Sequence, residues 1–283
     1  MNLFCFFFIK CCYLCILKEK LGIQMAIITL TSDWGTSDYY AAAVKGVILS
    51  QIPSATIVDI THEVAHYNIV QAGFILRNCY RNFPEGTIHI VAIETIESEQ
   101  NPHVVVKAHG HYFVGTDNGV FSHILDNEFE EAVFIDVEQD TDFYTFSSRD
   151  RFAKVAVMIA RGEPLSAIGA QRKQLNSGGS FCATVKNNII EGIVMYVDAY
   201  ENLITNIPKE LFQQVGQGRD FVIKVKGDLY TIDEISDCYD DVDQVEPVAL
   251  FGTHGFLELA LNHAPMSSLW GVDIRSTIQV VFK

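Results

Sequence analysis

The sequence predicts an α/β fold class: an N-terminal α/β domain with a largely parallel sheet, followed by a smaller C-terminal all-β domain. In the first half, apolar β-branched runs alternate with segments of helical periodicity, the order typical of parallel sheets. Beyond residue 181, short β-branched runs follow one another without long helical segments. Between these parts lies a polar stretch, residues 171–180, that contains Gly178-Gly179 and is predicted to be a linker. The 283 residues suffice for two buried cores.

The first predicted strand leads into a polar loop, and we expect the rest of the N-terminal domain to be organised around this loop. The apolar run Ile27–Thr31 stops at Asp33-Trp34-Gly35, and a helix over about Tyr39–Gln51 begins just beyond Asp38. Ligands of open α/β sheets bind outside the carboxyl ends of strands, so a loop there with two carboxylates and an aromatic residue is a candidate site. Asp residues also turn chains and cap helices, and that alternative role stays open for both.

The remaining segments continue the two patterns, giving an N-terminal domain over residues 25–170 and a C-terminal domain over residues 181–283. Pro53 and Pro84 mark breaks after the first and second helices. Further predicted elements of the N-terminal domain are strands Thr56–Thr61, Thr87–Ile93, Val104–Ala108, Tyr112–Gly115 and Ala132–Val137 and helices Ile69–Phe83 and Arg151–Arg161. Predicted C-terminal strands are Cys182–Lys186, Ile189–Asp198, Phe221–Val225, Val248–Phe251, Leu257–Leu261 and Thr277–Phe282.

Residues 1–24 differ from the rest in composition. Phe4–Leu17 is almost wholly apolar and is followed by Lys18-Glu-Lys20. It is short for a membrane-spanning helix, which needs about 20 apolar residues. A secretory signal is the second interpretation, although Lys10 interrupts the apolar core and no small-x-small cleavage site follows. We favour the third, a non-native extension upstream of a true start at Met25.

Charge and cysteine content restrict the partners and the compartment. Lys plus Arg number 20 against 35 Asp plus Glu, so the formal charge is −15 and no basic patch offers itself to nucleic acid or to an anionic membrane. Without residues 1–24 the cysteines are Cys79, Cys182 and Cys238, which form no CxxC pair. Neither a disulfide framework nor a cysteine-based zinc site is predicted, and a reducing cytoplasm is the expected location.

One motif suggests a metal. His62-Glu-Val-Ala-His66 matches the H-E-x-x-H pattern of zinc peptidases, in which both His lie one turn apart on a helix. Here the motif follows the strand Thr56–Thr61 at once, where the backbone is only leaving β geometry. Loop residues at the mouth of a strand are therefore the favoured interpretation, and a zinc peptidase is the remote alternative.

Further polar turns follow predicted strands. They are Asp117-Asn118-Gly119, Asp198-Ala-Tyr-Glu-Asn202 and Gly252-Thr-His-Gly255. Each is compatible with a simple turn. Because such turns converge when their strands share a sheet edge or a domain interface, they are also candidate ligand contacts, and glycine permits close approach of backbone to ligand.

The chain from about Ile27 onward resembles the S-adenosyl-L-methionine (SAM) hydroxide adenosyltransferases, or SAM hydrolases, and the related fluorinase and chlorinase. The resemblance rests on the order and spacing of several short motifs. They are Thr31-Ser-Asp-Trp-Gly35, Ile57-Val-Asp-Ile-Thr-His62, Phe83-Pro-Glu-Gly-Thr-Ile-His89, Val114-Gly-Thr-Asp-Asn-Gly119, Asn202-Leu-Ile-Thr-Asn206 and Gly255-Phe-Leu-Glu-Leu-Ala260.

The resemblance implies a barrel-like C-terminal domain and a homotrimer that binds SAM between the N-terminal domain of one subunit and the C-terminal domain of the next. It implies that Asp33 holds the ribose hydroxyls and Asp38 the methionine ammonium. The other implied SAM contacts are Tyr67 at the ribose, Tyr200 on the base, Asn202 at adenine, and Asp198, Thr253 and His254 at the methionine end. Asn118 is a further implied contact. These residue types suit a diol, an ammonium, a purine edge and a sulfonium.

The sequence departs from the family pattern at the catalytic residues. The family's hydrolases carry an Asp-Arg-His triad in a DPGVGTERR-like loop and an FHGRD motif. Here the loop is Ile93–Asn101, with Glu94 in place of the Asp and no Arg, and the second motif is Phe146-Ser-Ser-Arg-Asp150, with Ser147 in place of the His. Ser148 stands where the fluorinase motif also has Ser. The catalytic candidates are therefore Glu94, Ser147, Ser148 and Arg149.

The resemblance predicts an enzyme that hydrolyses SAM to adenosine and L-methionine by attack of water on the ribose C5′. SAM is its substrate, and no cofactor or metal is expected. The alternative is a catalytically degenerate protein that binds SAM or adenosine.

Overall fold

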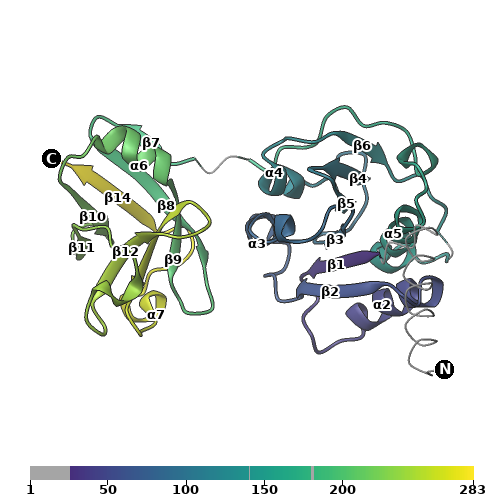
Figure 1. The fold of residues 1–283 in the computed structure, drawn as a ribbon, viewed down its shortest axis with the longest axis horizontal. Coiled ribbons are helices and arrows are strands. Elements are labelled where there is room, and N and C mark those ends of the chain that lie inside the picture. The colour runs from purple at the N-terminus through teal and green to yellow at the C-terminus, as the bar shows by residue number, and fades with distance from the viewer. Residues whose placement is uncertain (1–25, 140, 180–181) are drawn as a thin grey trace, which may run out of the picture. The chain divides into compact units, whose positions relative to one another are not determined.

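The computed structural model describes residues 26–139, 141–179 and 182–283, and the chain divides into two compact units, the first ending at Asn176 and the second beginning at Ser177. Figure 1 labels their elements. The predicted extension over residues 1–24 and the start at Met25 lie outside the described residues. Among the helices that are described, none has both the length and the apolar character needed to cross a membrane.

The first unit contains a six-stranded mixed sheet in the order β2-β1-β3-β5-β4-β6. Strands β2, β1, β3 and β5 run parallel, whereas β4 is antiparallel to both β5 and β6. The strands are β1 Ile27–Ser32, β2 Thr56–Thr61, β3 Ile88–Ala92, β4 His103–Ala108, β5 His111–Thr116 and β6 Glu131–Phe134. The carboxyl ends of the four parallel strands therefore lie along one edge of the sheet.

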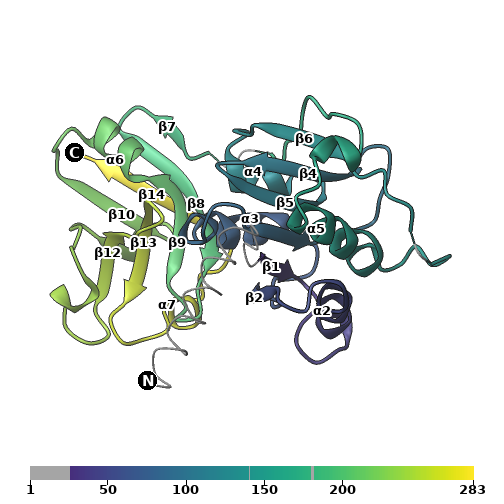
Figure 2. The ribbon, with the colours of Figure 1, turned by 45° about the vertical axis from the view of Figure 1, so that its right-hand side comes forward.

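Helices cover both faces of this sheet. Figures 1 and 2 both show α3 (Ile69–Arg77) and α4 (Val120–Leu125) on one face and α2 (Tyr40–Gln51) and α5 (Ala153–Ala160) on the other. Short helices complete the unit: η1 Tyr80–Asn82, η2 Ser148–Phe152 and η3 Leu165–Ala167. Asn68 is the N-cap of helix α3, because its side chain accepts a hydrogen bond from the Gln71 N–H.

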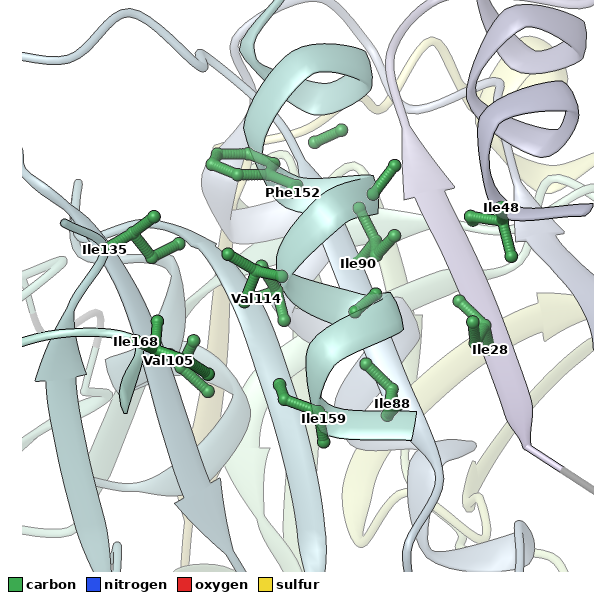
Figure 3. Packing of buried hydrophobic residues seen from close by; sticks show 14 of the residues in the cluster. Ile28, Ile48, Ile88, Ile90, Val105, Val114, Ile135, Phe152, Ile159 and Ile168 are labelled. Atoms are coloured by element: carbon green, nitrogen blue, oxygen red, sulfur yellow. The ribbon is translucent and has the colours of Figure 1, made fainter. Parts of the chain in front are cut away.

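Successive side chains of the buried strands point alternately to the two helical layers, and both layers receive apolar side chains. Figure 3 shows Ile88 of β3 beside Ile159 and Ile90 closer to Phe152, on the side of α2 and α5. Val91 belongs instead to the cluster with Leu76 on the side of α3 and α4. Successive side chains of a strand point to opposite faces, so a continuous apolar run is buried on both faces. This double burial fixes the sheet and hence the position of the loops at its edge.

The second unit is an antiparallel sheet in the order β11-β10-β14-β8-β9-β13-β12, with β7 paired to β8. Its elements are β7 Thr184–Lys186, β8 Ile189–Val197, β9 Leu203–Pro208, α6 Lys209–Gly216, β10 Phe221–Val225, β11 Tyr230–Ile232, η4 Tyr239–Asp241, β12 Pro247–Phe251, β13 Phe256–Leu261, α7 Met266–Trp270 and β14 Thr277–Phe282. The two end strands, β11 and β12, contact each other, which gives the sheet a barrel-like form.

The predicted fold class is confirmed, with differences at individual elements. The predicted helix Ile69–Phe83 ends at Arg77 and continues only as the turn η1, and the predicted helix Arg151–Arg161 is η2 followed by α5. Helices α4, α6 and α7 and strands β9 and β11 were not predicted. Helices α4 and α7 and strand β11 are too short to show a periodic pattern, whereas β9 and α6 are as long as elements that were predicted.

Candidate functional site

The polar loops of the first unit gather at one edge of its sheet. Asp33 follows β1, His62 follows β2, Glu94 follows β3 and Asn118 follows β5. His103, the first residue of the antiparallel strand β4, pairs with Thr116 at the end of β5 and so lies at the same edge. The sheet topology therefore brings together segments that are far apart in the sequence.

The loop after β1 is anchored to the loop after β2. The Ser32 Oγ lies 2.6 Å from the His62 Nδ1, and the Gly35 N–H donates to the His62 carbonyl at 2.7 Å. The Asp33 carboxylate accepts the Tyr67 N–H at 3.0 Å. Asp33 is half-buried, whereas Asp38 is exposed and Tyr67 is 71 % exposed with a φ of 63°. One carboxylate oxygen of Asp33 thus links the two loops through a hydrogen bond, while the side chain remains partly exposed to solvent.

An aromatic cluster joins this loop to the Phe146 turn. The Trp34 ring stacks on His62 at a centroid distance of 5.7 Å and meets Phe146 edge-on at 6.0 Å. Tyr40 also packs edge-on against Phe146, at 5.3 Å. The turn that follows Phe146 is therefore held beside the Asp33 loop, and the cluster supplies apolar surface and π faces at the sheet edge.

The catalytic candidates after Phe146 lie at the start of η2. Ser147 and Ser148 are both buried, with exposures of 6 % and 1 %. Arg149 forms a bidentate pair with Asp150, Nε to Oδ1 at 2.5 Å and Nη2 to Oδ2 at 2.8 Å, and its guanidinium lies over the Phe146 ring. This pairing, chiefly its hydrogen bonding, raises the pKa of Arg149. The Arg149 charge is thus partly balanced within the turn itself.

Glu94 adopts a strained backbone conformation directly beyond β3. Its φ is 50° and its side chain is exposed. Asn118 donates from Nδ2 to the preceding carbonyl, that of Ile93, at 3.0 Å, and accepts the Val120 N–H through its Oδ1 at 3.2 Å. The Asn118 amide therefore bonds to the protein through both of its polar atoms.

The H-E-x-x-H segment does not form a zinc-peptidase helix. Residues 62–66 lie in the irregular stretch between β2 and α3. His62 is buried on Ser32 and Trp34, whereas His66 is exposed. Within the described ranges no group of His, Cys, Asp and Glu is arranged to hold a metal ion. The segment serves instead to support the Asp33 loop.

Asp117, next to Asn118, fixes the end of the first unit. It is fully buried and accepts hydrogen bonds from the Arg172 Nε at 2.7 Å and from the Asn176 N–H at 2.9 Å. Burial raises the pKa of Asp117, and the Asn176 hydrogen bond and the Arg172 charge act against that rise. The sequence indicated a turn or a ligand contact here; the structure shows an ion pair whose carboxylate is buried.

Three candidates of the second unit line a cavity of about 760 Å³, whereas Thr253 and His254 do not line it. Asp198, Tyr200 and Asn202 line it from the turn between β8 and β9. The Asp198 Oδ1 accepts the N–H groups of Tyr200 and Asn202, at 2.9 and 2.8 Å, and its Oδ2 accepts the Asn202 amide at 3.1 Å. Tyr200 is 80 % exposed. The turn is thereby rigid and presents an aromatic ring; cavities of several hundred Å³ suit small-molecule ligands.

A hydrogen-bonded chain links the hairpin between β12 and β13 to this cavity. The His254 Nε2 lies 3.1 Å from the Glu258 Oε2, and the His254 Nδ1 accepts the Phe256 N–H at 3.1 Å. Tyr239, which lines the cavity, donates to the Glu258 Oε1 at 2.5 Å. Burial and this carboxylate raise the pKa of Tyr239. Thr253 is exposed.

Sequence reasoning missed several residues that shape these sites. In the first unit they are Glu97, His103 and Arg151, and in the second Tyr239, Glu258 and Asn262. Glu258 lies in the motif Gly255–Ala260 and Glu97 in the loop Ile93–Asn101, but neither was assigned a role; the other residues belong to no recognisable motif and act through partners distant in the sequence. His103 offered the best clue, because a histidine that begins a buried strand needs hydrogen-bond partners.

Together the fold and these sites define a protein of two units. One is a layered α/β unit with carboxylates and aromatic residues at its sheet edge, and the other is a barrel-like unit with a cavity lined by both polar and apolar residues. Comparison with known proteins makes the class specific. Residues 28–169 match the SAM hydroxide adenosyltransferase N-terminal domain, and residues 192–279 match the C-terminal domain. The chain belongs to the SAM hydroxide adenosyltransferase family.

Individual relatives span nearly the whole chain. It is similar to an (R)-S-adenosyl-L-methionine hydrolase of Methanocaldococcus jannaschii, with 30 % identity over 90 % of this chain and 96 % of the relative. A fluorinase of an Actinoplanes species is 24 % identical over 90 % of this chain and 97 % of its own. A solved structure of an uncharacterized conserved protein from Thermotoga maritima superposes with a TM-score of 0.81 at 29 % identity, covering 90 % of this chain and 99 % of that chain.

Proposed function

We propose that this protein binds SAM and hydrolyses it to adenosine and L-methionine. Water attacks the ribose C5′, the bond from C5′ to sulfur breaks, and its electron pair neutralises the sulfonium, so that methionine leaves as a thioether. The proton lost by water passes to Glu94. Binding of the cation beside carboxylates and exclusion of bulk water supply orientation and electrostatic stabilisation. SAM is the substrate, and the proposal needs no cofactor or metal.

The observation that carries the proposal is the cavity lined by Asp198, Tyr200 and Asn202, because the family resemblance assigns these residues to SAM. The 30 % identity to a relative named as an (R)-SAM hydrolase supports the same substrate class. In the proposal Asp33 holds the ribose diol and Asp38 the methionine ammonium. Tyr67 and Asn118 are the other SAM contacts from the first unit. Thr253 and His254 are the other SAM contacts from the second unit.

We further propose a cytoplasmic homotrimer in which the first unit of one subunit and the second unit of the next enclose each ligand. The support is that the candidate residues fall into two groups, one in each unit. Light scattering of the purified protein measures the mass directly. A monomer that hydrolyses SAM at full rate would contradict the trimer and leave the activity standing.

The test of the activity is incubation of the purified protein with SAM, followed by chromatography for adenosine and methionine. Both sulfonium epimers are used, because the named relative acts on the R form. Parallel incubations contain fluoride or chloride, because other relatives are fluorinases. Adenosine formed without halide is the expected result. A halogenated adenosine would assign halide as the nucleophile, and binding without any product would assign a SAM-binding protein.

A further inference from the structure

We propose that His103 and Arg151 are positioning residues, which hold the main chain around Glu94 in the one conformation that presents its carboxylate for catalysis. The inference rests on the proposed function, in which Glu94 accepts the proton of the attacking water. It concerns the buried His103 and the largely buried Arg151, which need not touch the substrate.

The backbone of Glu94 needs an external constraint. Its φ of 50° lies in the left-handed region, which is unfavourable for a residue with a Cβ. Such strain persists only where the surrounding structure imposes it, and it concentrates at functional sites. The Glu94 side chain is exposed, so its own burial does not provide the constraint.

The constraint comes from the two carbonyl groups that flank Glu94. The preceding carbonyl, of Ile93, accepts a hydrogen bond from the Asn118 amide at 3.0 Å. The following residue's carbonyl, of Thr95, lies 2.9 Å from the His103 Nε2. Asn118 and His103 belong to separate strand ends of the rigid sheet edge, so Glu94 is held from both sides by groups that cannot move independently.

The contacts of His103 fix its protonation state. A carbonyl oxygen only accepts, so the Nε2 facing Thr95 carries the proton. The Nδ1 lies 3.1 Å from the Arg151 Nη1, and a guanidinium only donates, so this nitrogen accepts. Both contacts are satisfied only by the neutral imidazole protonated at Nε2. Burial lowers the pKa of His103, in agreement with this geometry.

Arg151 ties this arrangement to the Phe146 turn. It lies on η2, two residues after Arg149, and its guanidinium also bonds to the Glu97 carboxylate and to the Ile135 carbonyl. The Glu97 Oε1 in turn accepts a hydrogen bond from the backbone N–H of His103 at 3.4 Å. Arg151 therefore connects the turn that carries Ser147 and Ser148 to the loop that carries Glu94.

Two variants of His103 separate positioning from simple packing. His103→Gln keeps an amide donor for Thr95 and an oxygen acceptor for Arg151, whereas His103→Leu fills similar space without either. We expect kcat to fall about 10²-fold in His103→Leu, with KM and the calorimetric Kd for SAM nearly unchanged, and to recover largely in His103→Gln. Arg151→Met should resemble His103→Leu. In a Glu94→Gln background, His103→Leu should have no further effect on kcat.

Amide hydrogen exchange over residues 93–101 provides a readout that needs no turnover. Exchange should accelerate in His103→Leu and stay close to that of the unmodified protein in His103→Gln. If the protein binds or hydrolyses no SAM, the proposed function fails, and exchange alone decides the positioning inference. Equal exchange in all three proteins, or equal loss of kcat in the Leu and Gln variants, would overturn it.

Discussion

At the scale of single residues, Asp33 combines two tasks. One carboxylate oxygen accepts the Tyr67 N–H and thereby links the loops after β1 and β2. In the proposed complex the same carboxylate binds the ribose diol. The Ser32 hydroxyl on His62 and the Trp34 ring hold the loop from beneath, so the carboxylate is fixed before the ligand arrives.

Asp33→Ala should abolish measurable binding of SAM and adenosine. Hydrogen bonds to a charged group contribute about 1.5–3 kcal/mol each, so even one lost bond weakens binding more than about tenfold. Asp33→Asn keeps an oxygen for the Tyr67 N–H and removes the charge, so it should fold normally and bind weakly. Calorimetry measures both, and unchanged affinity in the Ala variant contradicts the assignment.

Glu94→Gln should separate binding from catalysis. It preserves the shape of the side chain but removes the proton acceptor, so SAM should bind nearly as before. Adenosine formation should fall by about 10²–10⁴-fold, the usual contribution of a general base. Chromatography of timed incubations measures this rate. Rapid hydrolysis by the variant would move the search for the base to Ser147 and Ser148.

At the scale of elements, the hairpin between β12 and β13 depends on a close approach at Gly252. A Cβ at this position would lie 2.4 Å from the His254 Nε2 and 3.0 Å from the Glu258 Oε2. A methyl group there would displace the imidazole from the carboxylate without entering the barrel core. Glycine thus permits the contact between His254 and Glu258.

Gly252→Ala should therefore weaken SAM binding and leave adenosine binding intact, because the resemblance assigns His254 to the methionine end. Loss of one net hydrogen bond of about 0.5–1.5 kcal/mol corresponds to a roughly 2- to 12-fold loss of affinity. Competition between the two ligands in calorimetry distinguishes them. Equal weakening of both would show that the hairpin as a whole has shifted.

The elements also show what the sequence could predict. Buried strands such as β3 were found because continuous β-branched runs mark double burial, and the strand-end turns at Asp33 and Asp198 were found from polar residues that follow such runs. The contacts of Arg151 were not predictable, because they join η2 to a loop more than fifty residues earlier, as the 54-residue separation from Glu97 shows. Long-range pairing carries no local pattern.

At the scale of the whole molecule, buried histidines couple stability to pH. His89 is completely buried; its Nδ1 lies 2.7 Å from the Thr29 Oγ1 and its Nε2 3.2 Å from the His111 Nδ1. Burial, with the nearby His111, lowers the pKa of His89 to about 3. The unfolded chain takes up this proton near its ordinary pKa of about 6.5, whereas the folded protein does not. Stability is therefore greatest above that pH and falls as the pH decreases toward 3.

Between pH 7.5 and 5.5 the free energy of unfolding should fall by about 1.4 kcal/mol through His89 alone. Urea unfolding at both pH values measures the change, and few carboxylates titrate in this window. His89→Gln serves as the control, since it removes the titrating group; its stability should vary less with pH by that amount. An identical pH dependence in both proteins contradicts the role of His89.

The buried pair of Asp117 and Arg172 decides where the first unit could be excised as an independent fragment. A polypeptide that ended before Arg172 would leave the Asp117 carboxylate buried without its cation. Removing one partner of a buried ion pair lowers the free energy of unfolding by about 3–5 kcal/mol. The damage would reach the neighbouring Asn118, which holds the Ile93 carbonyl. Cleavage of the chain after Asn176 leaves the hydrogen bonds of Asp117 and Asn118 intact. A fragment meant to fold as the first unit must therefore extend at least to Asn176.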